Sequence, residues 1–210
     1  FTLGLLFALV RQIPAADRAM RRGGWDRVVG REIRGKTLGM VGLGAIGQLV
    51  VPGAFGLGLK VIYSDPLPSL RMEQEFGCER VELEELLRRS DFISLHCPLT
   101  LETEGLISDA QFALMKPDAY LINTARGRVV DEAALYRALS QNRIAGAALD
   151  VFSKEPPVGS PLLTLSNVIL TPHVASYTTE AIAKMSLMAA QNLLDVLEGR
   201  SSRYAVRAGG

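Results

Sequence analysis

The sequence predicts an α/β protein with a doubly wound, mostly parallel sheet of about seven strands and helices on both faces. Two observations support this prediction. From Lys36 onward, short apolar runs alternate with segments of helical periodicity, as in a parallel sheet covered on both sides. A glycine-rich turn, Gly42-Leu43-Gly44-Ala45-Ile46-Gly47, stands between the first apolar run and the first helical segment.

Composition agrees with this class and limits the function. The chain has 210 residues, 48% of them hydrophobic and 21% charged, which is ordinary for a soluble globular protein. A net charge of +1 predicts no nucleic-acid or membrane partner. The longest apolar stretch, residues 1–10, is shorter than the roughly 20 residues that span a bilayer. Two cysteines outside any metal-type spacing favour a cytoplasmic setting, and with two histidines we expect no metal site.

The N-terminal segment predicts a helix followed by a basic arm. Apolar residues recur at helical spacing over residues 1 to about 22: Leu3, Leu6, Val10 and Ile13. From Arg18 to Lys36 there are seven basic and two acidic residues around Trp25. A nucleic-acid arm and a solvated or subunit-contacting arm are both open, and the lack of a recognised nucleic-acid motif favours the second.

The remaining elements follow in alternation. Strands are expected at 38–42, 60–64, 78–80, 92–95, 119–123, 145–149 and 167–170. Helices are expected at 45–57, 69–76, 82–88, 109–115, 131–141 and about 175–198. Asp131 is the expected N-cap of its helix, and Gly199 lies just past the end of the last helix. Pro52 predicts a kink or an early end of the helix after the glycine turn, because an interior proline removes a backbone hydrogen bond.

The glycine turn predicts a dinucleotide site of the Rossmann type. Gly42 permits the tight turn out of the strand, Gly44 lets the backbone approach a pyrophosphate, and Gly47 lets the helix pack closely on the sheet. The exposed N–H groups at the start of that helix then favour phosphate charge.

The second strand ends at Asp65, in the position of a ribose-binding acid. Its carboxylate can accept hydrogen bonds from both hydroxyls of the adenosine ribose and would repel a 2′-phosphate, which favours NAD over NADP. The competing interpretation is a glycine loop without a ligand and a turn-forming aspartate before Pro66. The order strand, turn, helix, strand, acid favours the coenzyme.

Further polar residues directly follow expected strands: His96-Cys97-Pro98, Asn123-Thr124-Ala125-Arg126-Gly127, Asp150 and His173. Because ligands collect at the carboxyl ends of parallel strands, these residues should lie at the same sheet edge as the glycine turn. Arg126 could form a bidentate pair with a substrate carboxylate or polarise the neighbouring carbonyl. The alternative is a loop arginine in solvent, and its place directly after a strand argues against that.

His173 and Glu155 are candidates for proton transfer. An imidazole can give a proton to an oxygen as hydride reaches the carbon, and take it back in the reverse direction. Glu155, just before Pro156-Pro157, could hold the other ring nitrogen and favour the protonated ring. Taken singly, a histidine before a helix is more often a structural cap, and a glutamate before two prolines is more often a surface residue.

Five motifs in order resemble one family. They are Gly-Leu-Gly-Ala-Ile-Gly at 42–47, His-Cys-Pro-Leu-Thr at 96–100, Asn-Thr-Ala-Arg-Gly at 123–127, Ala-Leu-Asp-Val-Phe with Glu-Pro-Pro at 148–157, and Asn-Val-Ile-Leu-Thr-Pro-His at 167–173. With them, residues 36–176 resemble the coenzyme domain of the D-isomer-specific 2-hydroxyacid dehydrogenases. This family includes D-3-phosphoglycerate dehydrogenase, glyoxylate/hydroxypyruvate reductase and D-lactate dehydrogenase.

The resemblance implies a role for each matching residue. It makes Arg126 the substrate-binding arginine, Glu155 the acid that pairs with the histidine, and His173 the general acid/base. It implies a set of positions at the NAD site: Gly42, Gly44, Ala45, Ile46, Gly47, Asp65, His96, Cys97, Pro98, Thr124, Ala125, Arg126, Asp150 and His173. Among these, Asp150 would face the nicotinamide carboxamide, and the turn at 96–98 would lie near the adenosine.

The resemblance also implies a domain organisation. Residues 1–35 match a helix and arm through which family members form homodimers, 36–198 the NAD-binding domain, and 199–210 the start of a connection to a substrate domain outside this chain. We therefore expect an isolated coenzyme domain that binds NAD but turns over poorly. Arg-Gln-Ile-Pro at 11–14 resembles phosphoglycerate dehydrogenases and Thr-Pro-His-Val-Ala-Ser at 171–176 resembles glyoxylate reductases, so the 2-hydroxy or 2-keto acid substrate stays open.

Two other classes of function use the same fold. One is an NAD(H)-sensing interaction protein, as in the transcriptional corepressors of this fold, which would be distinguished by peptide binding without turnover of 2-keto acids. The other is the NAD-binding domain of a hydrolase such as adenosylhomocysteinase. The Arg126, Glu155 and His173 series argues against the hydrolase.

Overall fold

The computed structural model describes residues 1–25, 27–202 and 204. These residues form two compact units, Phe1–His173 and Val174–Gly210. The expected connection at 199–210 lies largely outside the described residues, as does Asp26 of the basic arm.

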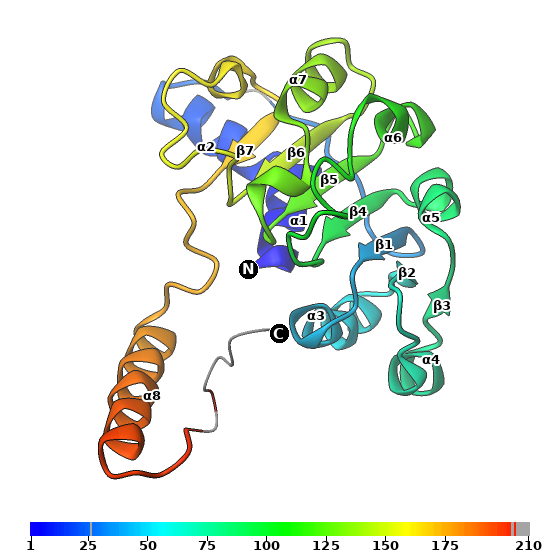
Figure 1. The fold of residues 1–210 in the computed structure, drawn as a ribbon. Coiled ribbons are helices and arrows are strands. Elements are labelled where there is room, and N and C mark those ends of the chain that lie inside the picture. The colour runs from blue at the N-terminus through cyan, green and yellow to red at the C-terminus, as the bar shows by residue number, and fades with distance from the viewer. Residues whose placement is uncertain (26, 203, 205–210) are drawn as a thin grey trace. The chain divides into compact units, whose positions relative to one another are not determined.

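The first unit contains a seven-stranded sheet in which every pair of neighbouring strands is parallel. Its strands are β1 (Thr37–Val41), β2 (Lys60–Ser64), β3 (Glu79–Arg80), β4 (Phe92–Leu95), β5 (Tyr120–Asn123), β6 (Gly146–Leu149) and β7 (Val168–Leu170). They lie in the order β3-β2-β1-β4-β5-β6-β7, so the direction of winding reverses between β1 and β4 (Figure 1). This confirms the doubly wound fold, whose ligands bind at the carboxyl ends of the strands beside that switch point.

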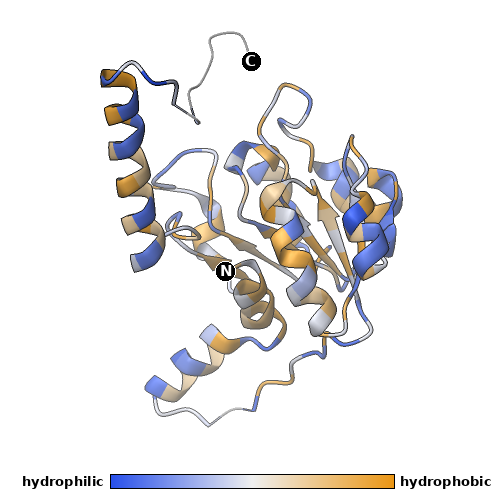
Figure 2. Cartoon of the chain, turned by 90° about the horizontal axis from the view of Figure 1, so that it is seen from below, coloured by the Kyte–Doolittle hydropathy of each residue, from blue (hydrophilic) through white to orange (hydrophobic). Residues whose placement is uncertain are grey.

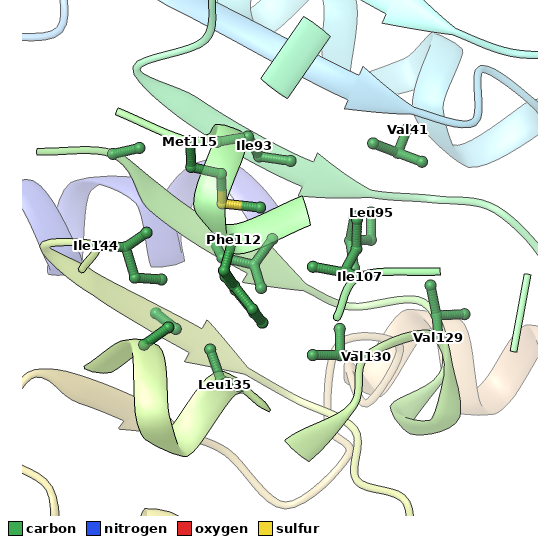
Figure 3. Close-up of a cluster of buried hydrophobic side chains, with 14 of the residues drawn as sticks. Val41, Ile93, Leu95, Ile107, Phe112, Met115, Val129, Val130, Leu135 and Ile144 are labelled. Atoms are coloured by element: carbon green, nitrogen blue, oxygen red, sulfur yellow. The ribbon is translucent and has the colours of Figure 1, made fainter. Parts of the chain in front are cut away.

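Helices cover both faces of the sheet and enclose two apolar cores. On one face lie α1 (Thr2–Val10), α3 (Ala45–Gly56) and α4 (Leu70–Phe76), and on the other lie α5 (Leu83–Arg89), α6 (Asp109–Leu114) and α7 (Glu132–Ser140). Successive strand residues point to opposite cores, as Leu121 and Ile122 of β5 do. The core beneath α5, α6 and α7 is shown in Figure 3. In Figure 2 the strands are coloured mainly as hydrophobic. Strands buried on both faces read as continuous apolar runs, which is why they were recognisable in the sequence.

The expected single N-terminal helix is wrong, because the chain forms two helices. Helix α1 ends at Val10, Gln12 takes a left-handed conformation with φ 51°, and α2 (Ile13–Arg21) begins in a new direction. Pro14 supplies the physical reason: in a continuous helix its ring would clash with the carbonyl of Val10 and leave that oxygen without a donor. The Val10 carbonyl instead accepts from the Arg31 N–H of the arm at 2.9 Å.

Pro52 does not end its helix early. Helix α3 continues to Gly56, one turn beyond the proline. Pro52 is exposed, so water can reach the Gln48 carbonyl that the proline cannot satisfy, while Val51 and Ala54 are buried and hold the helix against the sheet.

The connections and caps follow the expected chemistry. Asp131 caps α7 by accepting from the N–H groups of Ala133 and Ala134. Two 3₁₀ helices, η1 (Gly127–Val129) and η2 (Pro161–Thr164), lie in the connections beside β5 and before β7. In the second unit, α8 (Thr179–Leu197) is followed by Gly199 with φ 74°, as expected of a residue just past a helix end. Among the described residues, no helix is long and apolar enough to cross a membrane.

Candidate active site

The glycine turn lies at the switch point, between the ends of β1 and β4. Gly42 has φ 88°, and a Cβ there would come within 2.6 Å of the Cys97 backbone nitrogen, so only glycine fits. Gly44 is the N-cap of α3, and a Cβ built on it would meet nothing within 4 Å. Gly44, Ala45 and Ile46 are exposed, whereas Gly47 is buried. The turn therefore offers an exposed helix N-terminus that a pyrophosphate can approach closely.

Asp65 lies against this turn. Its Oδ2 accepts from the Leu43 N–H at 2.7 Å, and its Oδ1 accepts from the Leu67 N–H at 2.9 Å. A carboxylate has about four acceptor positions, so two backbone contacts fix its orientation and leave capacity for ribose hydroxyls. Arg80 of β3 donates to the backbone carbonyls of Asp65 and Pro66 at 3.0 and 2.8 Å, which holds the loop that carries the acid. No sequence motif pointed to Arg80, since its contact depends on the pairing of β3 with β2.

The turn after β4 places uncharged groups beside the glycines. His96 Nε2 and Ser94 Oγ lie 2.8 Å apart, and burial lowers the pKa of His96 to about 4. The Cys97 thiol is also buried, which raises its pKa. Pro98 is exposed. At neutral pH this turn contributes a neutral imidazole and a neutral thiol, as suits a surface beside a nucleoside.

The loop after β5 is held by its own asparagine. Asn123 is buried; its Nδ2 donates to the Arg126 carbonyl, and its Oδ1 accepts from the Ala125 N–H, both at 3.0 Å. Thr124 lies 3.2 Å from Thr2 of α1 through their hydroxyl oxygens. The Arg126 side chain is exposed and donates to the Ala125 carbonyl at 2.7 Å. None of the ion pairs among the described residues includes Arg126, so its guanidinium is available to an anion.

Asp150 and Thr171 support the backbone that carries His173. Asp150 is fully buried, and its Oδ1 accepts from the Thr171 hydroxyl at 2.6 Å. The Thr171 carbonyl accepts from the His173 N–H at 3.0 Å. His173 has φ 55°, a left-handed conformation that is uncommon outside glycine and persists only where surrounding contacts hold it. The structure thus places Asp150 against Thr171, whose carbonyl holds the His173 backbone.

Glu155 and His173 form a hydrogen-bonded pair. His173 Nδ1 lies 2.8 Å from Glu155 Oε2, and the other carboxylate oxygen accepts from the Phe152 N–H at 3.1 Å. The hydrogen bond to His173 lowers the pKa of Glu155, and the Phe152 N–H and the charges of His173 and Arg126 add to the effect. Glu155 is therefore ionised at neutral pH. Engagement of Nδ1 fixes the ring and leaves Nε2 as the nitrogen for proton exchange.

The structure brings the sequence-predicted residues to one edge in two groups. Gly42 and Gly47 meet the His96-Cys97 turn, with Asp65 on the other side of the glycine turn. Arg126, Glu155 and His173 form the second group, joined by the hydrogen bond of the last two and by the charge of Arg126. Sequence reasoning missed the supporting residues Leu43, Phe152 and Thr171, because their contacts use backbone groups or a hydroxyl without a motif.

A large cavity of the first unit lies away from these charged residues. A cavity of about 590 Å³ lies between the α1–α2 corner and β5–β7, but none of the residues Arg126, Glu155 and His173 lines it. We therefore place the active site at the strand ends, where the charged groups converge. In the part of the chain that the structure describes, no three His, Cys, Asp or Glu side chains form a metal-binding group.

The comparisons with known proteins agree with this geometry. The sequence model of the D-isomer specific 2-hydroxyacid dehydrogenase NAD-binding domain matches residues 3–175. A glyoxylate reductase of Korarchaeum cryptofilum is 46% identical over 206 residues, which cover 95% of this chain and 62% of the relative. A D-3-phosphoglycerate dehydrogenase of Methanocaldococcus jannaschii is 46% identical over 208 residues, 98% of this chain and 40% of the relative.

A solved structure gives the same result. The D-lactate dehydrogenase of Aquifex aeolicus, complexed with NAD and lactic acid, superposes with a TM-score of 0.88 at 34% identity. The match covers 94% of this chain and 65% of that one, so the chain spans less than two thirds of these relatives. Together with the glycine turn at the switch point, Asp65 beside it and the paired Glu155 and His173, the match over residues 3–175 shows that the chain belongs to the D-isomer-specific 2-hydroxyacid dehydrogenases, as their NAD-binding domain.

Proposed function

We propose that this domain belongs to an enzyme that transfers a hydride between nicotinamide C4 and C2 of a D-2-hydroxy acid or its 2-keto acid. The observation that supports it most directly is the 2.8 Å contact of His173 with Glu155, with Arg126 close enough for its charge to act on the same carboxylate. A proton carrier and a cation for a carboxylate thus lie together at the sheet edge that carries the glycine turn.

The residues divide the task as follows. Bound NADH supplies the hydride, and NAD⁺ accepts it in the reverse direction. Arg126 holds the substrate carboxylate and polarises the keto oxygen. His173 gives the proton from Nε2 to that oxygen as C2 becomes tetrahedral, and removes it when the hydroxy acid is oxidised. Glu155 holds Nδ1 and stabilises the charged ring before the proton leaves.

The position of Asp65 beside the glycine turn supports NAD rather than NADP as the preferred coenzyme. The Asp65 carboxylate lies within a hydrogen bond of the Leu43 N–H in the glycine turn. A ribose bound beside that turn would meet the carboxylate, which can accept from two hydroxyls but would repel a 2′-phosphate. Arg80 donates to backbone carbonyls on the same loop, so its guanidinium is engaged in holding the loop.

We further propose a cytoplasmic homodimer formed through residues 1–35, with 36–198 as the coenzyme domain and no nucleic-acid or membrane partner. Both cysteines are free and buried, as suits a reducing compartment. In α2 and the arm, Ile13, Met20, Trp25 and Val29 are all more than half exposed, which is unusual for apolar side chains that face only water. Light scattering after size exclusion would test the dimer, and a monomer at micromolar concentration would contradict it.

A substrate screen tests the proposed activity. The full-length enzyme that contains this chain should oxidise NADH with at least one of 3-phosphohydroxypyruvate, glyoxylate, hydroxypyruvate and pyruvate. The His173→Ala variant is the matched control, because it removes the proton carrier and keeps the glycine turn and Asp65. Failure with every one of these keto acids, while NADH still binds, would refute the proposed reaction.

A further inference from the structure

Glu132 has a contact that its position on α7 does not require. The capping of this helix is already performed by Asp131, which accepts from the N–H groups of Ala133 and Ala134. The Glu132 side chain instead accepts from the Ser153 backbone N–H at 2.6 Å, across 21 residues of sequence. A carboxylate on a backbone N–H is a charge-assisted hydrogen bond, which is shorter and stronger than a neutral one.

The bond reaches the loop that carries Glu155. Ser153 follows Phe152, whose N–H donates to Glu155 Oε1 at 3.1 Å, and the second oxygen of Glu155 meets His173 at 2.8 Å. Glu132 therefore anchors one peptide unit of this loop, and the neighbouring N–H holds the acid. The two contacts fix consecutive backbone N–H groups, so a shift of the loop would move both.

The same loop presses against the loop of Arg126. A Cβ built on Gly127 would fall inside the backbone of Phe152 and Ser153, so the two segments are in contact at a position that only glycine allows. The contact with Gly127 and the hydrogen bond to Glu132 therefore both restrain the segment 152–155. Because of this contact, the segment that holds the acid has little freedom relative to the segment that holds the arginine.

We propose that Glu132 is a positioning residue, which anchors the Ser153 backbone so that Glu155 meets His173. This inference rests on the proposed function of the Glu155 and His173 pair, and it assigns Glu132 no contact with substrate or coenzyme. The simpler interpretation is a first-turn acid that only stabilises the positive end of α7. The two interpretations differ in whether a change at Glu132 reaches His173.

The chain offers a direct readout, because it contains only two histidines. Proton NMR of the imidazole Hε1 signals over pH would follow His96 and His173 separately in the 210-residue chain. Glu155→Gln should move the His173 midpoint to lower pH, because the negative charge that stabilises the imidazolium is lost. Glu132→Ala should move it in the same direction by at least half as much.

Three further variants separate positioning from charge and from helix stability. Glu132→Gln keeps an acceptor for Ser153 and loses the charge, so it should leave the His173 midpoint unchanged. Glu132→Asp keeps the charge but is too short to reach Ser153, so it should act like Glu132→Ala even if the alanine variant folds poorly. Asp131→Ala is the matched control: it should lower the melting temperature through loss of the cap, with no shift at His173.

The outcomes separate this inference from the proposed function. Adding Glu132→Ala to Glu155→Gln should shift His173 no further, because the anchored group is already lost. If Glu155→Gln shifts His173 but neither Glu132→Ala nor Glu132→Asp does, the positioning role is refuted and the catalytic pair stands. An equal shift in Glu132→Gln would also refute it, in favour of a charge effect. No shift in Glu155→Gln would refute the pair itself, and the positioning role with it.

Discussion

The burial of His96 predicts a loss of stability in mild acid. Burial lowers the pKa of the folded-state imidazole to about 4, whereas an unperturbed histidine titrates at about 6.5. Between these values the unfolded chain binds a proton that the folded protein does not. The contribution to stability is therefore complete above about pH 6.5 and is lost as the pH falls toward 4.

The two pKa values set the size of this effect. A difference of about 2.5 units corresponds to about 3 kcal/mol when the pH is below both values. At pH 5 the unfolded imidazole is mostly protonated and the folded one mostly neutral, so about 2 kcal/mol should be lost relative to pH 8. This is a large part of the 5–15 kcal/mol typical of a domain.

Urea unfolding at pH 8 and pH 5 would measure the effect, with His96→Gln as the control that cannot take up the proton. The free energy of unfolding should fall by about 2 kcal/mol more in the parent chain than in the variant. Carboxylates that titrate in this range are present in both proteins, so their contribution cancels. Equal losses in the two proteins, or a His96 NMR signal that titrates near pH 6.5, would refute the assignment of His96 as a partly buried, neutral group.

Three predictions concern the coenzyme and the chemistry. The chain should bind NADH more tightly than NADPH in fluorescence titrations, and Asp65→Asn should narrow the gap; equal affinities in the parent would remove Asp65 from the ribose role. In the full-length enzyme, His173→Ala should lower kcat by about 10²- to 10⁴-fold and weaken NADH binding far less, and a small loss of kcat would contradict the role in proton transfer. Glu155→Gln should move the basic limb of the pH–rate profile for keto-acid reduction to lower pH. The lowered pKa of Glu155 keeps this side chain charged beside the His173 ring. Removal of that charge makes the imidazolium easier to deprotonate. An unchanged pH–rate profile would show that the two side chains do not work together.

Much of the fold was predictable because its signals are local. Buried parallel strands appear as short apolar runs, and the alternation with helices predicts the doubly wound sheet. The two errors both concern prolines. Pro14 breaks the N-terminal helical pattern into α1 and α2 and leaves Ile13 exposed, while the exposed Pro52 is tolerated inside α3. Both prolines were visible, but the consequence of each depends on what packs around the carbonyl four residues earlier.

The residues of the candidate site could be predicted from the sequence, but the contacts that orient them could not. The turn at 42–47, Asp65, Arg126, Glu155 and His173 could be chosen from sequence, because each follows a strand or stands at a motif position. Their meeting at one edge then follows from parallel topology. The contacts that orient them could not be chosen, since Leu43, Phe152 and Ser153 contribute only backbone N–H groups, which every residue except proline carries.

The sequence by itself determined the class of fold, the candidate coenzyme site and the residues that reach the carboxyl edge of the sheet. These properties depend on periodicity and on short spacings that act within one strand and the turn after it. The tertiary structure decided the neutral state of His96, the left-handed backbone of His173 and the anchor from Glu132 to Ser153. Burial and hydrogen bonds across 21 residues depend on which segments the completed sheet brings together, and no local pattern records them.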